Sequence, residues 1–480
     1  MTSDKQLIDG TWCEASNGAT WDVLNPATEA VVATVPFGNA ADCLLAIDAA
    51  QRAFAGWSRK TPYERGAVLD KTAALIRQDA AALAHTTVLE SGKPLAQARG
   101  EWLAAADLFE WFAEEGKRAY GRVVPSRTPG KRLLVLKQPL GVVGLITAWN
   151  FPAWNIARAG GAALAAGCTV VVRPSEYTPL SGMQVARLLT EAGAPPGVVN
   201  LVNGEPGPMG QAMLDHPAVA KIHFTGSTRV GKLLMDGASK TVTRLSLELG
   251  GNAPVLIFPD VDLEAVVAGA TAAKFRNGGQ VCVSPQRFLV SAQAAPEFTA
   301  RLAAAAGALR VGNGLDSRTQ VGPLINARQR DRVEALVNEA RAGGADIAAG
   351  GQRPVGHDIG YFYQPTIVGN VSADASLYRE EIFGPVLPVS TFDGVDEAIA
   401  IANRTRYGLA AYVWTNHLPT ALHVAERLEF GLVGVNEWTP QATEAPFAGW
   451  KESGLGRESG AEGLEEYLET KLVAIGGVPR

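Results

Sequence analysis

Short hydrophobic runs alternate with helical patterns between about residues 140 and 260. These runs are nearly continuous in apolar and β-branched residues, which is typical of strands buried on both faces. They cover residues 141–147, 169–172, 198–202, 221–225 and 254–258. Residues 178–193 have helix signals, with Thr178 at the N-cap, Pro179 in the first turn and Gly193 just past the end. The alternation predicts an open α/β sheet whose strands are mostly parallel.

The remaining segments predict further units around this sheet. An Ala-rich helical region occupies about residues 40–118, and a second α/β pattern runs from about 265 to 445. Residues 123–139 read as an extended arm, and residues 463–477 as a short helix followed by a strand. Such a terminal strand has an exposed edge, which pairing with another subunit would cover. At 480 residues the chain exceeds one compact core, so we expect two or three domains.

Composition and charge argue against several classes of function. Hydrophobic residues make up 47% of the chain and charged residues 19%, which is typical of a globular protein with a large core. The formal net charge is −5, and no run of Lys and Arg suggests a nucleic-acid partner. The longest apolar run, residues 159–172, is too short for a bilayer, and the N-terminus lacks a secretory signal. We therefore expect a cytoplasmic protein with no nucleic-acid or membrane partner.

The four cysteines lie far apart, and one of them has a context suited to chemistry. No C-x-x-C pair is present, so we expect neither a metal site nor a disulfide framework. Cys282 follows a helical pattern that ends near Asn277, where Gly278 and Gly279 break it. A buried structural cysteine is the usual interpretation, but these glycines favour an accessible thiol. A thiolate is a strong nucleophile when a base or a dipole helps it to ionise, and no histidine lies nearby in sequence.

The stretch FTGSTRVGK, residues 224–232, follows a predicted strand and should open a helix. Gly226 permits close backbone approach, and the free N–H groups of a helix N-terminus suit a phosphate. The stretch also matches G-x-x-x-x-G-K of a phosphate-binding loop. Leu233 stands where the Mg²⁺-binding hydroxyl would be, which argues against a phosphotransferase. An ordinary glycine turn fits the motif equally well.

Two further strand ends carry polar side chains with catalytic potential. Glu248 ends the alternating segment RLSLELGG, and burial there would raise the pKa of its carboxylate toward that of a general base. The alternative is a strand-end carboxylate paired with a basic residue. Asn150 follows the strand 141–147, where its amide can donate to a developing oxyanion. Arg158 is the only charged residue between Asn150 and Val172, and it must meet an anion or form an internal salt bridge.

Eight motifs in this order resemble the NAD(P)-dependent aldehyde dehydrogenase family. They are WNFP (149–152), RPSE (173–176), FTGS (224–227), ELGG (248–251), GQVC (279–282), EIFGP (381–385), NRTRYGL (403–409) and PFAGWKESGLGRE (446–458). Together the motifs span most of the chain. The resemblance implies an α/β fold with two doubly wound parallel-sheet domains and a β arm for oligomerisation. The implied parts are an NAD-binding domain (1–122 and 140–250), a catalytic domain (251–460) and the arm (123–139 and 461–480).

The resemblance also implies a role for individual residues. Cys282 would be the nucleophile, Glu248 the general base, and Asn150 with the N–H of Cys282 the oxyanion hole. The reaction would convert an aldehyde to an acid through a thiohemiacetal and a thioester, with NAD as cofactor, NADP as the alternative, and no metal. The residues implied for cofactor binding are Trp149, Arg173, Ser175, Glu176, Gly210, Gly226, Ser227, Val230, Gly231, Leu249, Glu381 and Phe383. Arg173 stands where the family usually has lysine. Glu176 favours NAD, because a carboxylate repels a 2′-phosphate.

The substrate class is inferred from two arginines and the pocket around them. Arg158 lies six residues after Pro152, and Arg276 lies six before Cys282, as in succinate-semialdehyde dehydrogenases. In those relatives the corresponding arginines hold the carboxylate at the far end of the substrate, so we expect succinate semialdehyde first and glutarate semialdehyde second. Phe447 is a third expected substrate contact.

Several alternatives to this assignment remain. Arg276 would also complement a helix C-terminus, and Gln441 and Ala442 replace the serine pair of that subfamily. Trp154 and Trp438 would also suit an aromatic or aliphatic aldehyde without a distal carboxylate. A CoA-acylating reaction is a further alternative, although such relatives typically lack the glutamate at position 248. The partners expected are the aldehyde and further copies of the chain, in a homodimer or a homotetramer.

Overall fold

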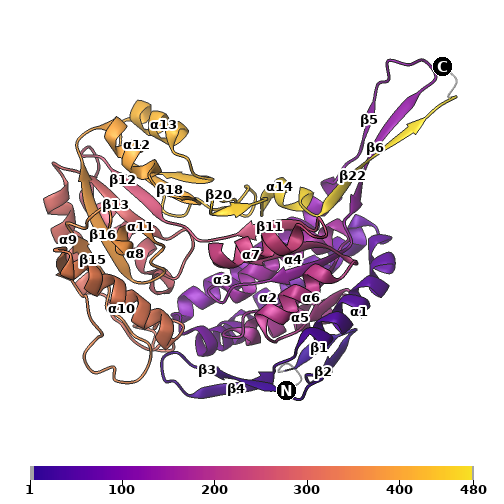
Figure 1. The fold of residues 1–480 in the computed structure, drawn as a ribbon, viewed down its shortest axis with the longest axis horizontal. Coiled ribbons are helices and arrows are strands. Elements are labelled where there is room, and N and C mark those ends of the chain that lie inside the picture. Colours follow the sequence, from indigo (N-terminus) through magenta and orange to yellow (C-terminus); the bar gives the residue numbers. More distant parts are fainter. Residues whose placement is uncertain (1–4, 478–480) are drawn as a thin grey trace.

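An eight-stranded sheet forms the larger half of the computed structural model, which describes residues 5–477 (Figure 1). Its strands, in spatial order, are β2 (Thr11–Cys13), β1 (Gln6–Ile8), β9 (Val199–Leu201), β8 (Thr169–Arg173), β7 (Val142–Ile146), β10 (Val219–Thr225), β11 (Arg244–Glu248) and β21 (Gly454–Leu455). The five strands from β9 to β11 are parallel, and β1 and β21 join them antiparallel on either side. The strand order reverses between β7 and β10, and the crevice at such a point is the usual ligand site of open α/β sheets.

Helices cover both faces of this sheet, because side chains alternate along its strands. On β7, Val142 and Ile146 pack against one group of helices, whereas Val143 and Leu145 pack against the other. The first group is α1 (Ala40–Ser58), α6 (Pro206–Asp215) and α7 (Thr228–Ala238). The second group is α2 (Pro62–Ser91), α3 (Leu95–Glu115), α4 (Pro152–Ala166) and α5 (Pro179–Ala192), and the short 3-10 helix η1 (Gly116–Arg118) follows α3. The predicted doubly wound architecture is therefore confirmed for this half.

A seven-stranded sheet forms the other half. Its strands, in spatial order, are β14 (Asp346–Ala349), β15 (Thr366–Gly369), β16 (Val386–Phe392), β13 (Pro285–Ser291), β12 (Ala253–Ile257), β18 (Ala410–Trp414) and β19 (Leu432–Val435). Only β14 is antiparallel to its neighbour. Its helices are α8 (Leu263–Phe275), η2 (Arg276–Gly279), α9 (Ala295–Gly307), α10 (Ala327–Ala342), α11 (Ser376–Arg379), α12 (Val395–Asn403) and α13 (Leu418–Arg427). Helices α8 and α9 pack on one face, and α12 and α13 on the other.

Three smaller sheets complete the fold. The arm projects from the molecule (Figure 1) and consists of β5 (Arg122–Val124), β6 (Arg132–Pro139) and β22 (Leu468–Ile475), which follows α14 (Gly460–Glu465). The hairpin β3 (Thr20–Leu24) and β4 (Val31–Pro36) and the pair β17 (Tyr407–Gly408) and β20 (Trp450–Lys451) are the others. One predicted boundary differs from the structure. Strand β21 pairs with β11 in the first sheet, so the segment before residue 460 returns to the first half.

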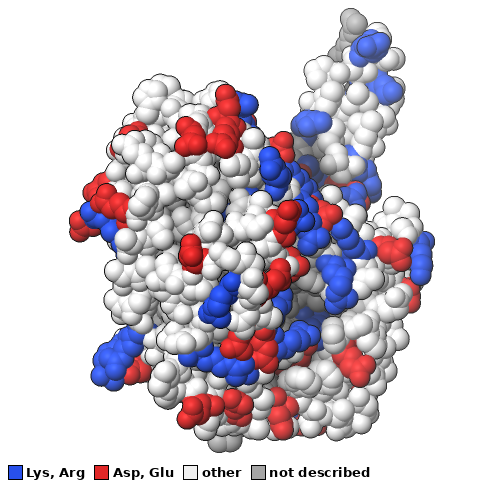
Figure 2. All heavy atoms as spheres, turned by 60° about the vertical axis from the view of Figure 1, so that its left-hand side comes forward, with Lys and Arg blue, Asp and Glu red and all other residues white. Residues whose placement is uncertain are grey.

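Charged side chains of both signs are interspersed over the surface. Figure 2 shows Lys and Arg next to Asp and Glu on one face of the molecule, including around the hollow that is visible in this view. No helix within residues 5–477 is both long and apolar enough to cross a membrane.

Candidate active site

A cavity of about 890 Å³ lies where the two sheet halves meet, and residues from both halves line it. This volume suits a small-molecule site. The predicted site residues that line it are Trp149, Asn150, Gly226, Ser227, Glu248, Leu249, Arg276, Cys282, Glu381, Phe383 and Phe447. Arg158, Arg173, Ser175, Glu176, Gly210, Val230 and Gly231 do not belong to the lining. The structure thus brings together the three residues expected to act in catalysis.

Cys282 lies on the connection between η2 and β13. Asn277, Gly278 and Gly279 have φ angles of 50°, 62° and 74°, so the chain turns sharply away from the direction of α8. A Cβ atom at Gly279 would lie 2.1 Å from the carbonyl oxygen of Gly384, which only glycine avoids. These residues place the half-buried thiol at the cavity wall.

The environment of the thiol favours its neutral form. Burial raises the pKa of Cys282 to about 12, and the positive charge of Arg158 acts in the opposite direction. The negative charges of Glu381 and Glu248 raise this pKa further. The thiol therefore needs a proton acceptor or an additional positive charge before it can attack as a thiolate.

Glu248 has the properties of that acceptor. It ends β11, and its two carboxylate oxygens are buried without a hydrogen-bond donor among residues 5–477. Burial raises the pKa of Glu248 well above its usual value, and the neighbouring Glu458 raises it further. The segments that carry Glu248 and Cys282 pack closely against each other, since a Cβ atom at Gly251 would lie only 2.5 Å from the carbonyl oxygen of Cys282. A buried carboxylate of raised pKa can accept a proton near neutral pH.

Behind Glu248, a buried cluster of charges surrounds Glu458. Its carboxylate forms an ion pair with Arg158, and the Nε2 atom of His223 lies 2.9 Å from its Oε1 atom. Burial by itself raises the pKa of Glu458, but the charges of Arg158 and His223 outweigh burial and hold this pKa below its usual value. Glu458 is therefore the negative member of the pair, and Glu248 is the member that holds a proton more readily.

Asn150 occupies the position expected of an oxyanion donor. It follows β7 at the point where the strand order reverses, and its Nδ2 atom donates to the carbonyl oxygen of Gln280 at 3.2 Å. An amide nitrogen carries two hydrogens, so this bond orients the group and leaves one hydrogen for a ligand. The backbone N–H of Cys282 donates to no acceptor among residues 5–477. Both donors therefore remain available beside the thiol.

The cofactor residues from the first sheet surround the N-terminus of α7. The Ser227 side chain caps this helix by accepting from the N–H of Val230 at 3.4 Å, and the N–H of Gly231 donates to the Ser227 carbonyl at 3.0 Å. The other first-turn N–H groups of a helix lack intrahelical partners and suit a phosphate. Gly226 and Leu249 lie next to them in the cavity lining.

Glu381 and Phe383 face this helix from the second half of the chain. The Oε1 atom of Glu381 accepts from the N–H of Gly251 at 2.9 Å, and burial raises the pKa of Glu381 to about 7. Phe383 has a φ angle of 52°, a strained value of the kind that clusters at ligand sites, and its ring lies 5.4 Å from that of Trp149. A carboxylate beside an aromatic wall fits the ribose and nicotinamide of NAD(P).

The residues expected around the adenosine lie beyond the cavity. Arg173 ends β8, and its Nη2 atom donates to Glu176 at 2.8 Å and to the carbonyl oxygen of Gly204 at 2.8 Å. Ser175 follows on the same turn, and its hydroxyl accepts from the N–H of Tyr177 at 3.4 Å. Gly210 lies in α6. The Arg173 guanidinium is therefore engaged by Glu176 on its own turn and by the Gly204 carbonyl after β9.

Arg158 does not have the position that the two-arginine hypothesis requires. Its side chain is 1% exposed, it pairs with Glu458, and it is absent from the cavity lining. The rings of Trp154 and Phe447 lie 4.1 Å and 4.2 Å from its guanidinium carbon and enclose it. The charge of Arg158 is neutralised inside the protein. Arg158 is therefore a member of an internal salt bridge, and the prediction that it contacts the substrate is replaced.

Arg276, in contrast, presents its charge to the cavity. Its guanidinium lines the cavity and forms no ion pair with any of residues 5–477. Burial lowers its pKa, and its guanidinium carbon lies 5.5 Å from the centre of the Phe151 ring. Phe447 lines the cavity, and Trp154 stands between the Phe151 and Phe447 rings. An arginine without an ion-pair partner beside these aromatic rings suits a ligand with a single distal anionic group.

Sequence reasoning missed Glu458, His223, Lys93 and Glu101. Glu458 lies inside the PFAGWKESGLGRE motif, but its partners are distant in sequence and no local pattern predicts them. Lys93 stands between Gly92 and Pro94, and a lone lysine between two helix-breaking residues was the only signal for it. Both Lys93 and Glu101 line the cavity from the N-terminal helical region, in which the sequence predicted no site residue.

Comparison with known proteins agrees with this geometry. The sequence profile of the aldehyde dehydrogenase family matches residues 12–473. The chain is 47% identical to the mitochondrial succinate-semialdehyde dehydrogenase of Oryza sativa subsp. japonica, over 98% of this chain and 89% of the relative. It is 44% identical to the 3-sulfolactaldehyde dehydrogenase of Pseudomonas putida, over 100% of this chain and 98% of the relative. The structure of betaine aldehyde dehydrogenase from Staphylococcus aureus in complex with NAD+ matches with a TM-score of 0.97 at 37% identity, covering 99% of this chain and 96% of that one. The resemblance carried by the motifs is thereby confirmed, and this chain belongs to the aldehyde dehydrogenase family.

Proposed function

We propose that this enzyme oxidises a short aldehyde that carries an anionic group at its far end. Succinate semialdehyde is the first candidate substrate, and glutarate semialdehyde is the second. The observation that carries this proposal is Arg276, a half-buried arginine in the cavity wall without an ion-pair partner among residues 5–477. A carboxylate would supply that partner through two parallel hydrogen bonds. The names of the relatives from rice and Pseudomonas putida support an aldehyde with an acidic group.

In the proposed reaction, the Sγ atom of Cys282 attacks the aldehyde carbon. The Asn150 amide and the N–H of Cys282 donate to the oxygen as it becomes negative, and such donors lower the barrier because they are already in place. Arg276 fixes the other end of the substrate, so the carbonyl is held near the sulfur. The attack gives a thiohemiacetal, and breaking its C–H bond, with the hydride passing to NAD(P)+ when this cofactor is bound, would leave a thioester on Cys282. Ser227, Glu381, Phe383 and Trp149 would hold the cofactor.

Glu248 completes the reaction as a base. Its carboxylate takes a proton from the water that attacks the thioester carbon, the C–S bond breaks, and the acid is released. The raised pKa of Glu248 suits this step, since a base is most effective when its pKa is near the working pH. The CoA-acylating alternative predicts a product only when CoA is present, and formation of the free acid without CoA would exclude it.

NAD is the preferred cofactor in this proposal, with NADP as the alternative. Glu176 forms an ion pair with Arg173. Its carboxylate still places a negative group on the turn where an adenosine ribose would lie. A carboxylate accepts from a ribose hydroxyl but repels a 2′-phosphate. Arg173 moderates this repulsion. Measuring kcat/KM for both cofactors tests the preference.

The deciding experiment compares aldehydes with and without a distal anion. Succinate semialdehyde, glutarate semialdehyde, 3-sulfolactaldehyde, butanal and benzaldehyde would be assayed at saturating NAD+ or NADP+. We expect kcat/KM for the best anionic aldehyde to exceed that for butanal by about 30-fold or more, because a charged hydrogen bond contributes about 2–3 kcal/mol. Equal values for butanal and succinate semialdehyde would contradict the proposal. Benzaldehyde as the best substrate would favour the aromatic alternative.

Assembly and location complete the proposal. Within residues 5–477, strand β22 pairs with β6 alone, so its other edge is free, and the strand also carries Leu472 and Ile475, which are 62% and 39% exposed. Pairing of this edge with a second copy would satisfy its free backbone groups and give a homodimer or a homotetramer. Light scattering of the purified chain tests this state. The four cysteines are all free thiols, which supports a reducing compartment such as the cytoplasm, and cell fractionation tests that location.

A further inference from the structure

Lys93 is buried at the junction between α2 and α3. Gly92 ends α2 with a φ angle of 76°, and Pro94 begins α3, so the intervening residue cannot continue either helix. A Cβ atom at Gly322, from the second half of the chain, would lie 2.2 Å from the carbonyl oxygen of Gly92. This contact packs the junction against the other half, and the Lys93 side chain points inward with none of it exposed.

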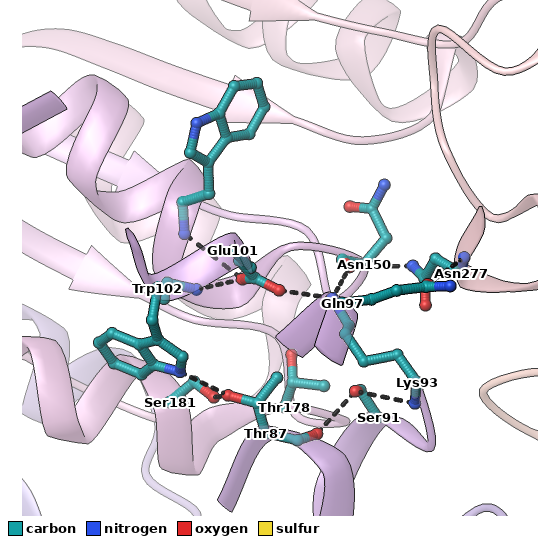
Figure 3. Close-up of polar contacts among 12 residues, drawn as sticks. Thr87, Ser91, Lys93, Gln97, Glu101, Trp102, Asn150, Thr178, Ser181 and Asn277 are labelled. Atoms are coloured by element: carbon teal, nitrogen blue, oxygen red, sulfur yellow. Dashed lines mark hydrogen bonds and ion pairs between the residues drawn. The ribbon is translucent and has the colours of Figure 1, made fainter. Parts of the chain in front are cut away.

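The ammonium group of Lys93 contacts the oxyanion donor through its backbone. Its Nζ atom donates to the carbonyl oxygen of Asn150 at 2.7 Å and to the Oε2 atom of Glu101 at 2.5 Å (Figure 3). It also lies 4.3 Å from the centre of the Phe151 ring. Lysine has three donors and needs partners for them when it is buried. The Lys93 ammonium therefore has its partners at Asn150 and at residues next to it in the structure.

Glu101 holds the chain on the other side of Asn150. Its Oε1 atom accepts from the N–H of Ala153 at 3.0 Å and from that of Trp154 at 3.4 Å. These are first-turn donors of α4, and its N-cap residue, Phe151, provides no side-chain cap. One buried carboxylate from α3 therefore caps α4 and also balances the charge of Lys93. Figure 3 shows Glu101 and Lys93 converging on this turn.

A second donor holds the same carbonyl from the thiol side. The Nδ2 atom of Asn277 donates to the Asn150 carbonyl at 3.1 Å and to the Gln280 carbonyl at 3.3 Å. The N–H of Asn277 donates in turn to the side chain of Gln97 at 2.7 Å. The Gln280 carbonyl also accepts from the Asn150 amide, so the network joins the two walls of the oxyanion site.

We propose that Lys93, together with Glu101, is a positioning residue for the oxyanion donor Asn150. Lys93 touches neither the reacting atoms nor the thiol in this network, and it acts by fixing the backbone from which the Asn150 amide projects. A displacement of about 1 Å at a reacting group can cost about 100-fold in rate. The inference rests on the proposed function, because it requires the Asn150 amide to stabilise an oxyanion.

A purely structural role predicts a different outcome. Burial lowers the pKa of Lys93, and a fully buried ion pair contributes little net stability because desolvation offsets its attraction. Removing one partner would destabilise the protein in either case. If Lys93 positions Asn150, its loss lowers kcat/KM only while the Asn150 side chain is present. A double-mutant cycle measures this dependence of one substitution on the other.

The experiment measures kcat/KM for the best aldehyde at saturating NAD+ in Lys93→Met, Asn150→Ala and the double variant. We expect losses of about 10- to 100-fold for Lys93→Met and about 100- to 1000-fold for Asn150→Ala. The double variant should fall no more than about threefold below Asn150→Ala. The Kd for NAD+ should stay within about twofold of the unmodified protein, since Lys93 contacts no predicted cofactor residue.

Two further variants keep the result interpretable. Lys221→Met removes another buried lysine, which pairs with Glu466 at 2.7 Å at the base of the arm, and it should lower stability without changing kcat/KM by more than about twofold. If Lys93→Met does not fold, Glu101→Gln replaces it in the cycle, because the amide oxygen can still cap α4 while the charge is lost. If the loss of kcat/KM in the double variant equals the product of the two single losses, the positioning role of Lys93 is wrong, while the proposed function stands. Full activity of Asn150→Ala would instead overturn the proposed function.

Discussion

Arg158 and Glu458 form an ion pair with only 1% and 2% of their side chains exposed. The pair lies beside Glu248 rather than in the substrate cavity, and each partner influences the pKa of Glu248. Glu458 raises this pKa, and Arg158 lowers it. The pair therefore sets the electrostatic environment of the proposed base, which is a different role from holding the substrate.

Glu458→Gln should move the acidic limb of the pH–rate profile to lower pH. The change removes a negative charge next to Glu248 and leaves the positive charge of Arg158 unbalanced. Both effects lower the pKa of Glu248, so its carboxylate stays ionised in more acidic solution. The kcat profile between about pH 5 and 9 measures the shift. Removing one partner of a buried pair should also cost about 3–5 kcal/mol of stability, seen as a lower melting temperature.

Glu465→Gln is the matched control for this variant. Glu465 lies on α14 with half of its side chain exposed, and Lys137 is its partner on the arm. Exposed ion pairs contribute little, so we expect neither the pH profile nor the melting temperature to change appreciably. An acidic limb that stays in place in Glu458→Gln would mean that Glu458 does not act on the base.

Arg276→Met and Arg158→Met should separate substrate binding from stability. Arg276→Met should lower kcat/KM for succinate semialdehyde by about 30-fold or more and leave that for butanal within a few-fold, because only the former carries a carboxylate. Arg158→Met should lower the melting temperature and leave the ratio between the two substrates unchanged, since its charge is paired internally. A larger change in that ratio for Arg158→Met than for Arg276→Met would reverse these assignments.

The fold was predictable because its signals are local. Continuous apolar runs marked the buried strands, and Pro179 and Gly193 marked the ends of α5. The motifs likewise located Cys282, Glu248 and Asn150, which the structure brings to one cavity. Local signals failed to predict hydrogen-bond partners where a residue distant in sequence caps a helix or pairs with a charge. Thr178 was expected to cap α5, but its hydroxyl donates to the Trp149 carbonyl at 3.3 Å instead.

The residue that caps α5 is Glu90, which precedes Leu180 by 90 residues. Its carboxylate accepts from the N–H groups of Leu180 and Ser181 at 2.8 Å and 2.9 Å. The pair of Arg158 with Glu458 joins segments that are still farther apart in the sequence. Such partnerships depend on how α2 packs against α5, or how β21 joins the first sheet, and no window of the sequence contains both members.

Glu90→Gln should alter how stability depends on pH. Burial raises the pKa of Glu90 to about 8 in the folded protein, from about 4.5 in the unfolded chain. The folded state therefore holds a proton that the unfolded state releases between these values, and this contribution to stability is present below about pH 4.5 and lost as pH rises through about 8. Melting temperatures of the two proteins should lie closest near pH 5, where Glu90 is protonated and resembles the amide, and Glu90→Gln should gain relative to the unmodified protein as pH rises toward 9, because the amide avoids the buried charge. A constant difference across this range would contradict the raised pKa.

Lys274→Met should stabilise the protein at neutral pH. The Lys274 side chain lies in α8 with none of it exposed, and its Nζ atom has no hydrogen-bond partner among residues 5–477. Burial lowers the pKa of this amine from 10.5 to about 7. The unfolded chain therefore binds a proton that the folded chain releases, so stability is lost as pH falls from about 10.5 to about 7. Methionine fills a similar volume without an unpaired polar atom, which should gain about 1–3 kcal/mol near pH 7.

The pH dependence separates this effect from a general improvement in packing. Above about pH 10.5 both states of the unmodified protein hold a neutral amine, so the advantage of Lys274→Met should shrink to the cost of one buried polar group. Lys240→Met, at an exposed position, should leave the melting temperature unchanged at every pH. Lys274→Met that melts earlier than the unmodified protein at pH 7 would show that the amine has a partner, with Glu381 the first candidate because its charge already raises the pKa of Lys274.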